Sequence, residues 1–292
     1  MRISATLLSL LLLVGPVLAG QDELNKQLYD AMLFNDPATI TMLLTKGADA
    51  NHEVNGRCVL SWAAQRGNAD VVRALLAGDA DPNPVDSSGY TPLMRAIEAR
   101  KVEVVQPLLE AGADTNRRDS YGRLLVNLAV EADKTQIVEA LLKTGADFNV
   151  ADAEGNSPAL LAVLGEGEAM YETLAVFGRY GVDMNLGNSS YTPLYYAVEK
   201  GNIEMVQSLL KAGADPSIAN ESGHLPLTSA LANEEMLGML LAAGADPNGV
   251  GVNGDPVLFE ALFAVSIEAA EALIDAGANV NKHGADGRTP LA

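Results

Sequence analysis

The sequence predicts a solenoid built from about eight helical repeats, and its periodicity carries that prediction. A motif of two apolar residues, two polar residues and Gly-Ala-Asp first occurs within residues 43–51 and recurs along the chain. Successive copies are 32, 33, 33, 36, 32, 31 and 33 residues apart. A fixed period near 33 is typical of stacked repeats, each of which needs a neighbour to cover its apolar face. The recurring glycine position is held by Gly47, Asp79, Gly112, Gly145, Gly181, Gly213, Gly244 and Gly277.

The third unit indicates how one repeat is built. Asp86 and Gly89 are turn residues, and Thr91 is placed to cap a first helix. Pro92 then falls in the first turn, where a missing N–H costs nothing. Gly112 follows a second helix as a left-handed cap, so the unit is a turn and two helices. The predicted buried positions, at helical spacing, are Leu93, Ala96, Ile97, Val104, Val105, Leu108 and Leu109.

On these residues the chain resembles the ankyrin-repeat family, whose unit is a β-hairpin finger followed by two antiparallel helices. The Thr-Pro-Leu motif recurs at Thr91, Thr192 and Thr289, and the resemblance covers about residues 22–292. It implies a helix-dominated solenoid that forms a single domain over 20–292. The expected units are a polar cap at 22–52, repeats at about 53–85, 86–118, 119–151, 152–187, 188–219, 220–250 and 251–283, and a partial unit at 284–292.

Several units depart from the pattern. Asp79 replaces Gly at the left-handed position, and Ser190 replaces the turn Gly of its finger. Pro107 falls inside a helix and predicts a kink, because it removes one backbone hydrogen bond. About three extra residues near 165–168 lengthen one inter-helix loop, and the seventh unit is short by about two near 233–235. We expect local weakness in the fourth to seventh units.

The first nineteen residues are expected to be a cleaved secretory signal. Arg2 supplies the positive charge, and residues 7–14 form a run that is apolar apart from Ser9. Val17 and Ala19 are the small residues before a cleavage site. The run is shorter than the roughly 20 apolar residues that a membrane span needs. We therefore expect an exported chain that begins at Gly20 and does not insert into the membrane.

The expected mature chain is strongly acidic. Removal of residues 1–19 takes away one Arg and no acid, so the formal charge moves from −19 to −20. Nucleic acids and anionic lipid surfaces require positive charge on a protein, so neither is an expected partner. Complementary charge favours a basic partner protein, although net charge by itself also serves solubility.

The sequence offers little support for catalysis or for a metal or cofactor. Cys58 is the only cysteine and stands where other repeats carry the Thr of Thr-Pro-Leu, which favours a packing role over a reactive thiol. His52, His224 and His283 lie in separate units without metal-ligand spacing. The Asp of each Gly-Ala-Asp is expected to hydrogen-bond inside its own repeat. We expect no enzymatic activity, no cofactor and no metal.

The resemblance implies that a partner binds to the finger tips and to the inner faces of the first helices. Aromatic residues and Arg dominate binding hot spots, and several of them occupy those positions. Ordinary packing between repeats is the alternative role for each one. The candidate partner-binding residues are Trp62, Tyr90, Arg95, Tyr121, Tyr191 and Tyr196.

Taken together, these features predict a monomeric, non-catalytic module that docks another protein on its concave face. The signal segment and the resemblance favour a bacterial periplasm, where the chain would serve as an enzyme accessory or scaffold, or as an immunity-type inhibitor of a toxin. The alternative is a secreted effector that binds host proteins outside the producing cell. Self-association is a further possibility, because the partial last unit could leave Ala261, Leu262, Leu273 and Ile274 uncovered.

Overall fold

The computed structural model describes residues 20–289 apart from residues 166, 168 and 265. Within that range the chain forms sixteen helices, α2–α17, and one short hairpin. It divides into two compact units, unit 1 ending at Ala113 and unit 2 beginning at Asp114. The predicted signal segment, Glu166, Glu168 and the end of the partial unit at 290–292 lie outside the described residues.

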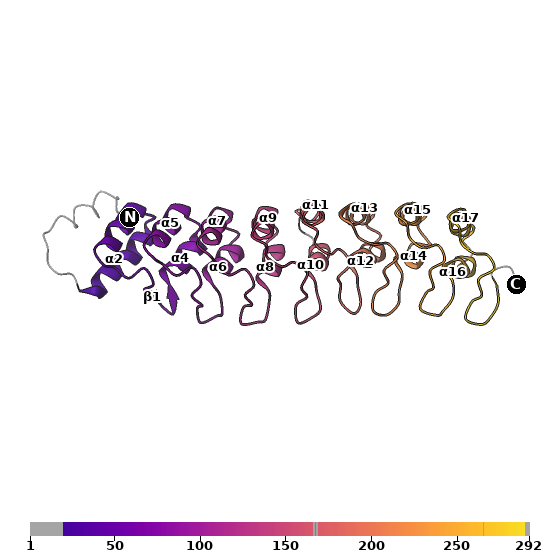
Figure 1. Cartoon of the computed structure of the whole chain (residues 1–292), viewed down its shortest axis with the longest axis horizontal. Helices are drawn as coiled ribbons and strands as arrows, with labels where there is room; N and C mark the ends of the chain where they lie inside the picture. The colour runs from indigo at the N-terminus through magenta and orange to yellow at the C-terminus, as the bar shows by residue number, and fades with distance from the viewer. Residues whose placement is uncertain (1–19, 166, 168, 265, 290–292) are drawn as a thin grey trace, which may run out of the picture. The chain divides into compact units, whose positions relative to one another are not determined.

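Unit 1 contains the cap and two repeats, and its helices form two rows (Figure 1). In one row α4 packs against α2 and α6, and in the other α5 packs against α3 and α7. Strands β1 (Glu53–Val54) and β2 (Arg57–Cys58) pair antiparallel, with Glu53 opposite Cys58. The helices are α2 (Gln21–Leu33), α3 (Pro37–Thr45), α4 (Val59–Arg66), α5 (Ala69–Ala77), α6 (Pro92–Glu98) and α7 (Val102–Glu110).

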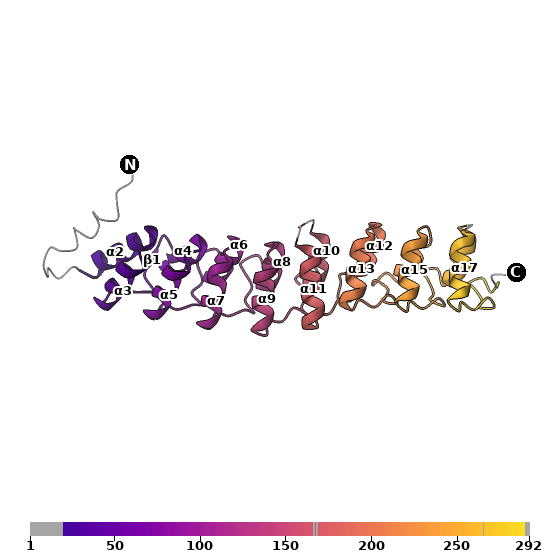
Figure 2. The same ribbon diagram turned by 90° about the horizontal axis from the view of Figure 1, so that it is seen from above.

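Unit 2 repeats the same plan. The first helices α8, α10, α12, α14 and α16 pack successively in one row, and the second helices α9, α11, α13, α15 and α17 pack in the other. Fingers project beyond the row of first helices (Figure 1), and Figure 2 shows the second helices side by side in chain order. The helices are α8 (Leu125–Glu131), α9 (Thr135–Lys143), α10 (Pro158–Leu164), α11 (Met170–Tyr180), α12 (Pro193–Glu199), α13 (Ile203–Ala212), α14 (Pro226–Ser229), α15 (Glu234–Ala242), α16 (Val257–Phe263) and α17 (Ile267–Asp275).

The predicted apolar faces are confirmed. Every position predicted to be buried in the third unit is buried, and Leu93, Ile97 and Leu108 have no exposed surface. The expectation for the last repeat was half wrong. Leu262 and Ile274 are exposed, but Ala261 and Leu273 are fully buried, because α16 and α17 pack against each other.

Side-chain caps start four of the first helices. Thr91 Oγ1 accepts a hydrogen bond of 3.3 Å from the Met94 N–H, and Ser157 and Thr192 do the same in their repeats. Cys58 fills this position with sulfur, since its Sγ accepts from the Ser61 N–H at 3.3 Å. The packing role predicted for Cys58 is confirmed, and capping adds to it.

The backbone at the recurring glycine position is left-handed in every repeat, including Asp79, where φ is 64°. The side chain of the Asp in Gly-Ala-Asp accepts a hydrogen bond from a backbone N–H of its own repeat. Asp114 Oδ1, for example, accepts from the Asn116 N–H at 2.9 Å. The same bond recurs from Asp49 in the cap to Asp246 in the seventh unit, so the predicted structural role of these carboxylates is confirmed. In the last repeat, Asn279 Oδ1 accepts the equivalent bond.

The irregular units are visible in the structure. Ser190 does not take the left-handed conformation of the turn glycines, and Asn188 Oδ1 instead accepts the N–H groups of Ser190 and Tyr191. The first helix of the seventh unit, α14, has only four residues. Helix α7 runs through Pro107 to Glu110, and Pro107 is buried within it.

Gly187 precedes the finger that contains Ser190, and among the glycines of unit 2 it has the least room for a side chain. A Cβ at this position would collide with the Tyr191 carbonyl oxygen and would lie 2.8 Å from Thr192 Cα, both of which are backbone atoms that cannot rotate away. We expect Gly187→Ala to lower the free energy of unfolding by about 1–3 kcal/mol, the usual cost of overpacking. Urea denaturation followed by circular dichroism measures it.

Gly238→Ala is the matched control. Gly238 lies inside α15, where a Cβ would have no other atom within 4 Å. Alanine there is expected to stabilise the chain by roughly 0.5–1 kcal/mol through helix propensity. Equal urea midpoints for the two variants would contradict the assignment of Gly187.

Candidate functional site

The candidate site is built from a pair of positions that recurs in each repeat. In three repeats, the last residue of the finger before the capping position contacts the residue five positions later, on the first helix. Arg57 lies over the Trp62 ring at 4.2 Å, and Arg95 lies over the Tyr90 ring at 4.2 Å. In unit 2 the equivalent pair is Tyr191 and Tyr196, whose rings meet edge to face at 5.3 Å. Five of the six predicted site residues take part in these pairs. Tyr90 contacts Arg95 and Tyr191 contacts Tyr196, whereas Trp62 contacts Arg57, which was not predicted.

In unit 1 this arrangement holds the fold together. The carboxylate of Asp86 accepts hydrogen bonds from Arg95 Nε at 2.9 Å and Nη2 at 2.6 Å, and Arg57 Nε lies 3.4 Å away. Tyr90 and Arg95 are buried, with 4% and 8% of their surface exposed. Neither side chain is presented to a partner in this structure, so the packing alternative describes both better than the binding prediction does.

Trp62 is half-buried beside this network. Its Nε1 donates to the Val54 carbonyl at 3.3 Å, and the ring of Tyr29 stands edge-on at 6.3 Å. The first helix therefore places an aromatic and cationic surface next to the hairpin. Trp62 keeps part of its ring at the surface, so it remains a predicted binding residue.

Unit 2 gathers the largest aromatic cluster among the described residues. Tyr191 stacks on Tyr195 at 6.0 Å, and His224 of the next finger lies 5.8 Å from Tyr195. Lys200 Nζ is 5.3 Å from the Tyr196 ring. Sequence reasoning missed Tyr195, and it placed His224 at a finger tip without choosing it as a binding residue. Tyr195 occupies the buried position that Met94 fills in its own repeat, and His224 follows the turn glycine as Tyr90 does, so alignment of the repeats was the signal that could have found them.

Tyr121 is the most exposed predicted site residue, with 78% of its surface open. It lies on a finger of unit 2, where Arg123 contacts its ring at 5.6 Å. Because little of the ring is packed against the chain, Tyr121 can contribute contact area to a partner without loss of internal packing. The three residues Tyr121, Tyr191 and Tyr196 define the aromatic surface of unit 2.

The two units differ strongly in charge. Residues 114–292 contain 25 Asp and Glu against 10 Lys and Arg, a formal charge of −15, whereas residues 20–113 contain 13 against 8, a charge of −5. From residue 212 to residue 281 there are ten acidic residues and no Lys or Arg. Most of the net negative charge of residues 20–292 therefore lies in unit 2, while Arg123 and Lys200 lie beside the rings of Tyr121 and Tyr196.

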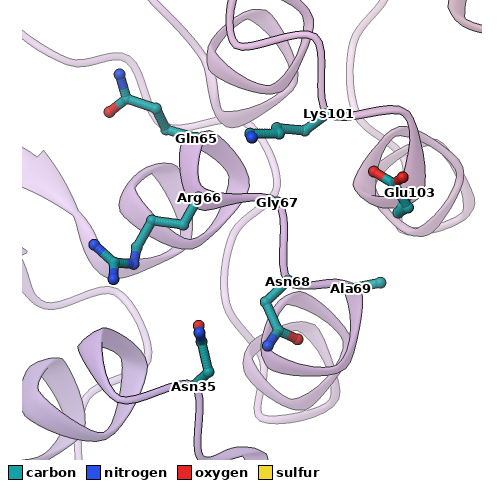
Figure 3. Close-up of a pocket in the computed structure, with 8 residues that line it drawn as sticks. All are labelled: Asn35, Gln65, Arg66, Gly67, Asn68, Ala69, Lys101 and Glu103. Atoms are coloured by element: carbon teal, nitrogen blue, oxygen red, sulfur yellow. The ribbon is translucent and has the colours of Figure 1, made fainter. Parts of the chain in front are cut away.

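A shallow hollow of about 570 Å³ lies in unit 1 where the loops between first and second helices meet. Figure 3 shows Asn35 and Arg66 converging on it from adjacent repeats. Arg66 already donates to the Leu33 carbonyl at 3.2 Å, and the other charged lining residues are Lys101 and Glu103. The lining residues include no His, Cys, Ser or Thr, and nothing in this hollow indicates chemistry.

Neither the thiol nor the carboxylates form a recognisable reactive centre in the described part of the chain. Burial raises the pKa of the Cys58 thiol, which disfavours the nucleophilic thiolate. No three His, Cys, Asp or Glu side chains in the described ranges are grouped so that they could hold a metal ion. No helix among those residues is both long and apolar enough to cross a bilayer.

Comparison with known proteins agrees with this geometry. The family model described as ankyrin repeats (3 copies) matches residues 28–119, 126–220 and 168–251. The chain belongs to the ankyrin-repeat family. The resemblance seen in the sequence is thus confirmed, and ankyrin repeats bind other proteins.

Relatives of this ankyrin-repeat chain include much longer proteins. "Ankyrin repeat protein nuc-2" of Neurospora crassa is 35% identical over 218 residues, which are 68% of this chain and 19% of that protein. "Ankyrin repeat domain-containing protein 63" of Homo sapiens is 39% identical over 66 residues, 21% of this chain and 17% of that protein. The chain therefore spans a fifth or less of these relatives, and the similarity concerns the repeats.

The buried ion pair of unit 1 gives a prediction for stability. Asp86→Asn removes the charge that Arg95 needs in the interior, and breaking one partner of a buried pair typically costs about 3–5 kcal/mol. Thermal and urea unfolding would measure the loss. Asp70→Asn is the matched control, because Asp70 pairs with Arg73 at the surface, where such pairs contribute about 0–1 kcal/mol. Equal losses in both variants would contradict the structural role of Asp86.

The same carboxylate sets a pH dependence. Burial alone would raise the pKa of Asp86, but hydrogen bonds from Arg95, Tyr90 N–H and Ser88 N–H outweigh it and hold the pKa below its usual range. A depressed folded pKa gives stability that is present above the unfolded pKa, about 3.9, and is lost as pH falls through the folded value. As the pH is lowered, the free energy of unfolding of Asp86→Asn should therefore fall less than that of the wild type. Urea denaturation at a series of acidic pH values measures the difference.

Proposed function

We propose that this ankyrin-repeat chain is a non-catalytic binding module that docks a basic protein on the fingers and first helices of unit 2. The observation that carries the proposal is the combination of an aromatic surface with a charge of −15 in that unit. Aromatic side chains supply contact area with little loss of conformational entropy, and negative charge attracts a positive partner and rejects a negative one.

Unit 1 supports a lesser part of the contact. Its largest aromatic–cationic network is satisfied internally, because Asp86, Arg95 and Tyr90 bind one another. A partner that met these residues would have to compete with bonds already made. The proposal therefore assigns affinity to Tyr121, Tyr191 and Tyr196, and keeps Trp62 as a candidate contact within unit 1 by itself.

The proposed location is the bacterial periplasm. The support is the sequence of residues 1–19, whose charged start, apolar run and small residues match a cleaved export signal. In that compartment the module would act as an accessory or scaffold for an enzyme, or as an immunity-type inhibitor that covers a basic toxin. A monomer is proposed, since the partner surface and the row contacts between repeats are separate. Secretion beyond the cell, as an effector for host proteins, is the alternative.

Affinity capture tests the binding function. The chain from residue 20 is tagged, exported in the native producer and recovered with its bound proteins, which mass spectrometry identifies. One stoichiometric basic protein is the expected result. Tyr121→Ala and Tyr196→Ala are each expected to weaken that complex by roughly 30-fold or more, the effect of a hot-spot residue worth about 2 kcal/mol.

Tyr180→Ala is the matched control for capture. Tyr180 is also an exposed tyrosine of unit 2, but it lies on the second helix α11, where its hydroxyl is 3.5 Å from Glu139 Oε1. Its loss should leave affinity within about twofold of the wild type. If Tyr180→Ala weakens the complex as much as Tyr196→Ala, the second helices form the docking surface and the proposal is wrong.

Cell fractionation tests the location. The periplasmic extract is expected to contain a chain whose first residue is Gly20, while Leu12→Arg, which interrupts the apolar run, should leave an uncleaved chain in the cytoplasm. Wild-type protein recovered from the medium instead would favour the secreted effector. Uncleaved wild-type protein in the cytoplasm would show that the proposed export is wrong.

A further inference from the structure

A hollow of about 370 Å³ lies in unit 2 between the second helices α11 and α13, which Figure 2 shows side by side. The two helices approach closely where small residues meet, since a Cβ at Gly178 would lie only 2.9 Å from Ala212 Cα. The lining therefore combines small apolar residues with larger polar ones. The lining residues are Tyr171, Ala175, Gly178 and Arg179 of α11 and Ser208, Lys211 and Ala212 of α13.

Two cations and no acid line this hollow. Acids outnumber basic residues by 25 to 10 over residues 114–292, so a lining that contains Arg179 and Lys211 but no carboxylate departs from the unit as a whole. The hollow of unit 1 differs, since Glu103 is part of its lining. The charge at the hollow of unit 2 therefore favours an anion.

Both cations keep most of their binding capacity for a ligand. No ion pair among the described residues involves Lys211, and Arg179 has one, in which its Nη2 lies 4.0 Å from Glu139 Oε1. The same carboxylate oxygen lies closer to Lys143 Nζ, at 3.4 Å. About 64% of the Arg179 side chain is exposed, so its guanidinium can bind an anion without the loss of a close ion pair.

A cation at the end of a second helix also has a structural role. Lys143, Arg179 and Lys211 hold the same position, two residues before the glycine that follows the helix, in three successive repeats. Positive charge is favoured there by the negative end of the helix dipole. Of the three, Arg179 and Lys211 line the hollow and Lys143 does not, so Lys143 is the matched position for the dipole role alone.

Hydroxyl groups supply hydrogen-bond donors beside the cations. Tyr171 Oη accepts a hydrogen bond from Asn202 Nδ2 at 3.4 Å, which leaves its own proton available for donation. Ser208 adds a second hydroxyl to the lining. The small residues of the lining bring no polar side-chain atom, so the hollow offers apolar contact next to its cations and donors.

We propose that the hollow between α11 and α13 binds a small organic anion, a carboxylate or a phosphate attached to an apolar body. A guanidinium matches either oxyanion with paired N–H donors, and the Lys211 ammonium adds a point charge. A volume of about 370 Å³ falls in the range of small-molecule sites and is more than a bare oxyanion fills. The site lies on the second helices, outside the aromatic surface of unit 2, so it goes beyond the proposed function and does not depend on it.

Nuclear magnetic resonance with small probes tests the site. The ¹⁵N-labelled chain from residue 20 is titrated with phenyl phosphate and with benzoate at constant ionic strength. Benzyl alcohol is the matched control for the apolar body without charge, and inorganic phosphate is the control for charge without the body. The expected result is that the backbone amides of Ala175, Ser208 and Ala212 shift most with the two aryl anions, less with inorganic phosphate and not with benzyl alcohol. The aryl anion with the lower midpoint identifies the preferred oxyanion.

Three variants establish whether the hollow is responsible. Arg179→Gln and Lys211→Gln should each raise the midpoint of the better aryl anion at least about tenfold, because each removes a charge-assisted contact. Ala175→Leu should abolish the shifts by filling the hollow, and the exposed position on α11 and the high helix propensity of Leu keep the fold. Lys143→Gln, the matched control, should leave the midpoint within about twofold of the wild type, since it changes only an exposed surface pair.

The remaining outcomes overturn the site. Equal shifts with benzyl alcohol would reduce it to apolar contact, and equal losses in Lys143→Gln and Lys211→Gln would reduce it to general surface charge. Full binding by Ala175→Leu would place the anion outside the hollow. A captured partner protein that shifts these amides when the aryl anions do not would assign the hollow to protein contact, whereas aryl anion binding without any captured partner would support the site and count against the proposed function.

Discussion

Packing between neighbouring repeats is the constraint on which the rest of this structure depends. The first helices are short, seven residues in α6 and four in α14, and helices of this length do not persist alone in water. They exist because each buries an apolar face against the preceding and following repeat. The fingers are then held at the end of a packed layer, and positions that recur in the sequence recur in space.

The same packing decides which polar groups are free for a partner. In unit 1, Asp86 is buried between two arginines, and its bonds join the finger of one repeat to the first helix of the same repeat and to Arg57 of the preceding one. In unit 2, Asp119 takes a similar place beside Arg123, whose guanidinium also lies 3.6 Å from Glu131. Asp152 instead accepts hydrogen bonds from the N–H groups of Glu154 and Asn156 in its own finger.

The side chains that can contact a partner are those that are not fully buried by packing between repeats. The aromatic surface of unit 2 combines half-buried rings, Tyr191 and Tyr196, with the exposed ring of Tyr121. The half-buried rings support one another by edge-to-face and stacked contacts, which fixes their orientation before a partner arrives. The rings of Tyr191 and Tyr196 are thus held in fixed orientations in a unit of net negative charge.

The sequence by itself determined the repeat period, the helix starts, the left-handed positions and the acidic balance, because each depends on local geometry or composition. Thr91, Gly112 and even Asp79 could be placed without knowledge of any neighbour. It could not separate Tyr90 and Arg95, which are buried, from Tyr121, which is exposed, since all three are hot-spot residue types at similar positions. Burial at these positions depends on contacts between residues that are distant in the sequence. Asp86 of the same repeat pairs with Arg95, and Arg57 of the preceding repeat reaches the same carboxylate. Only the tertiary structure decided that, because the sequence does not show which of these side chains meet.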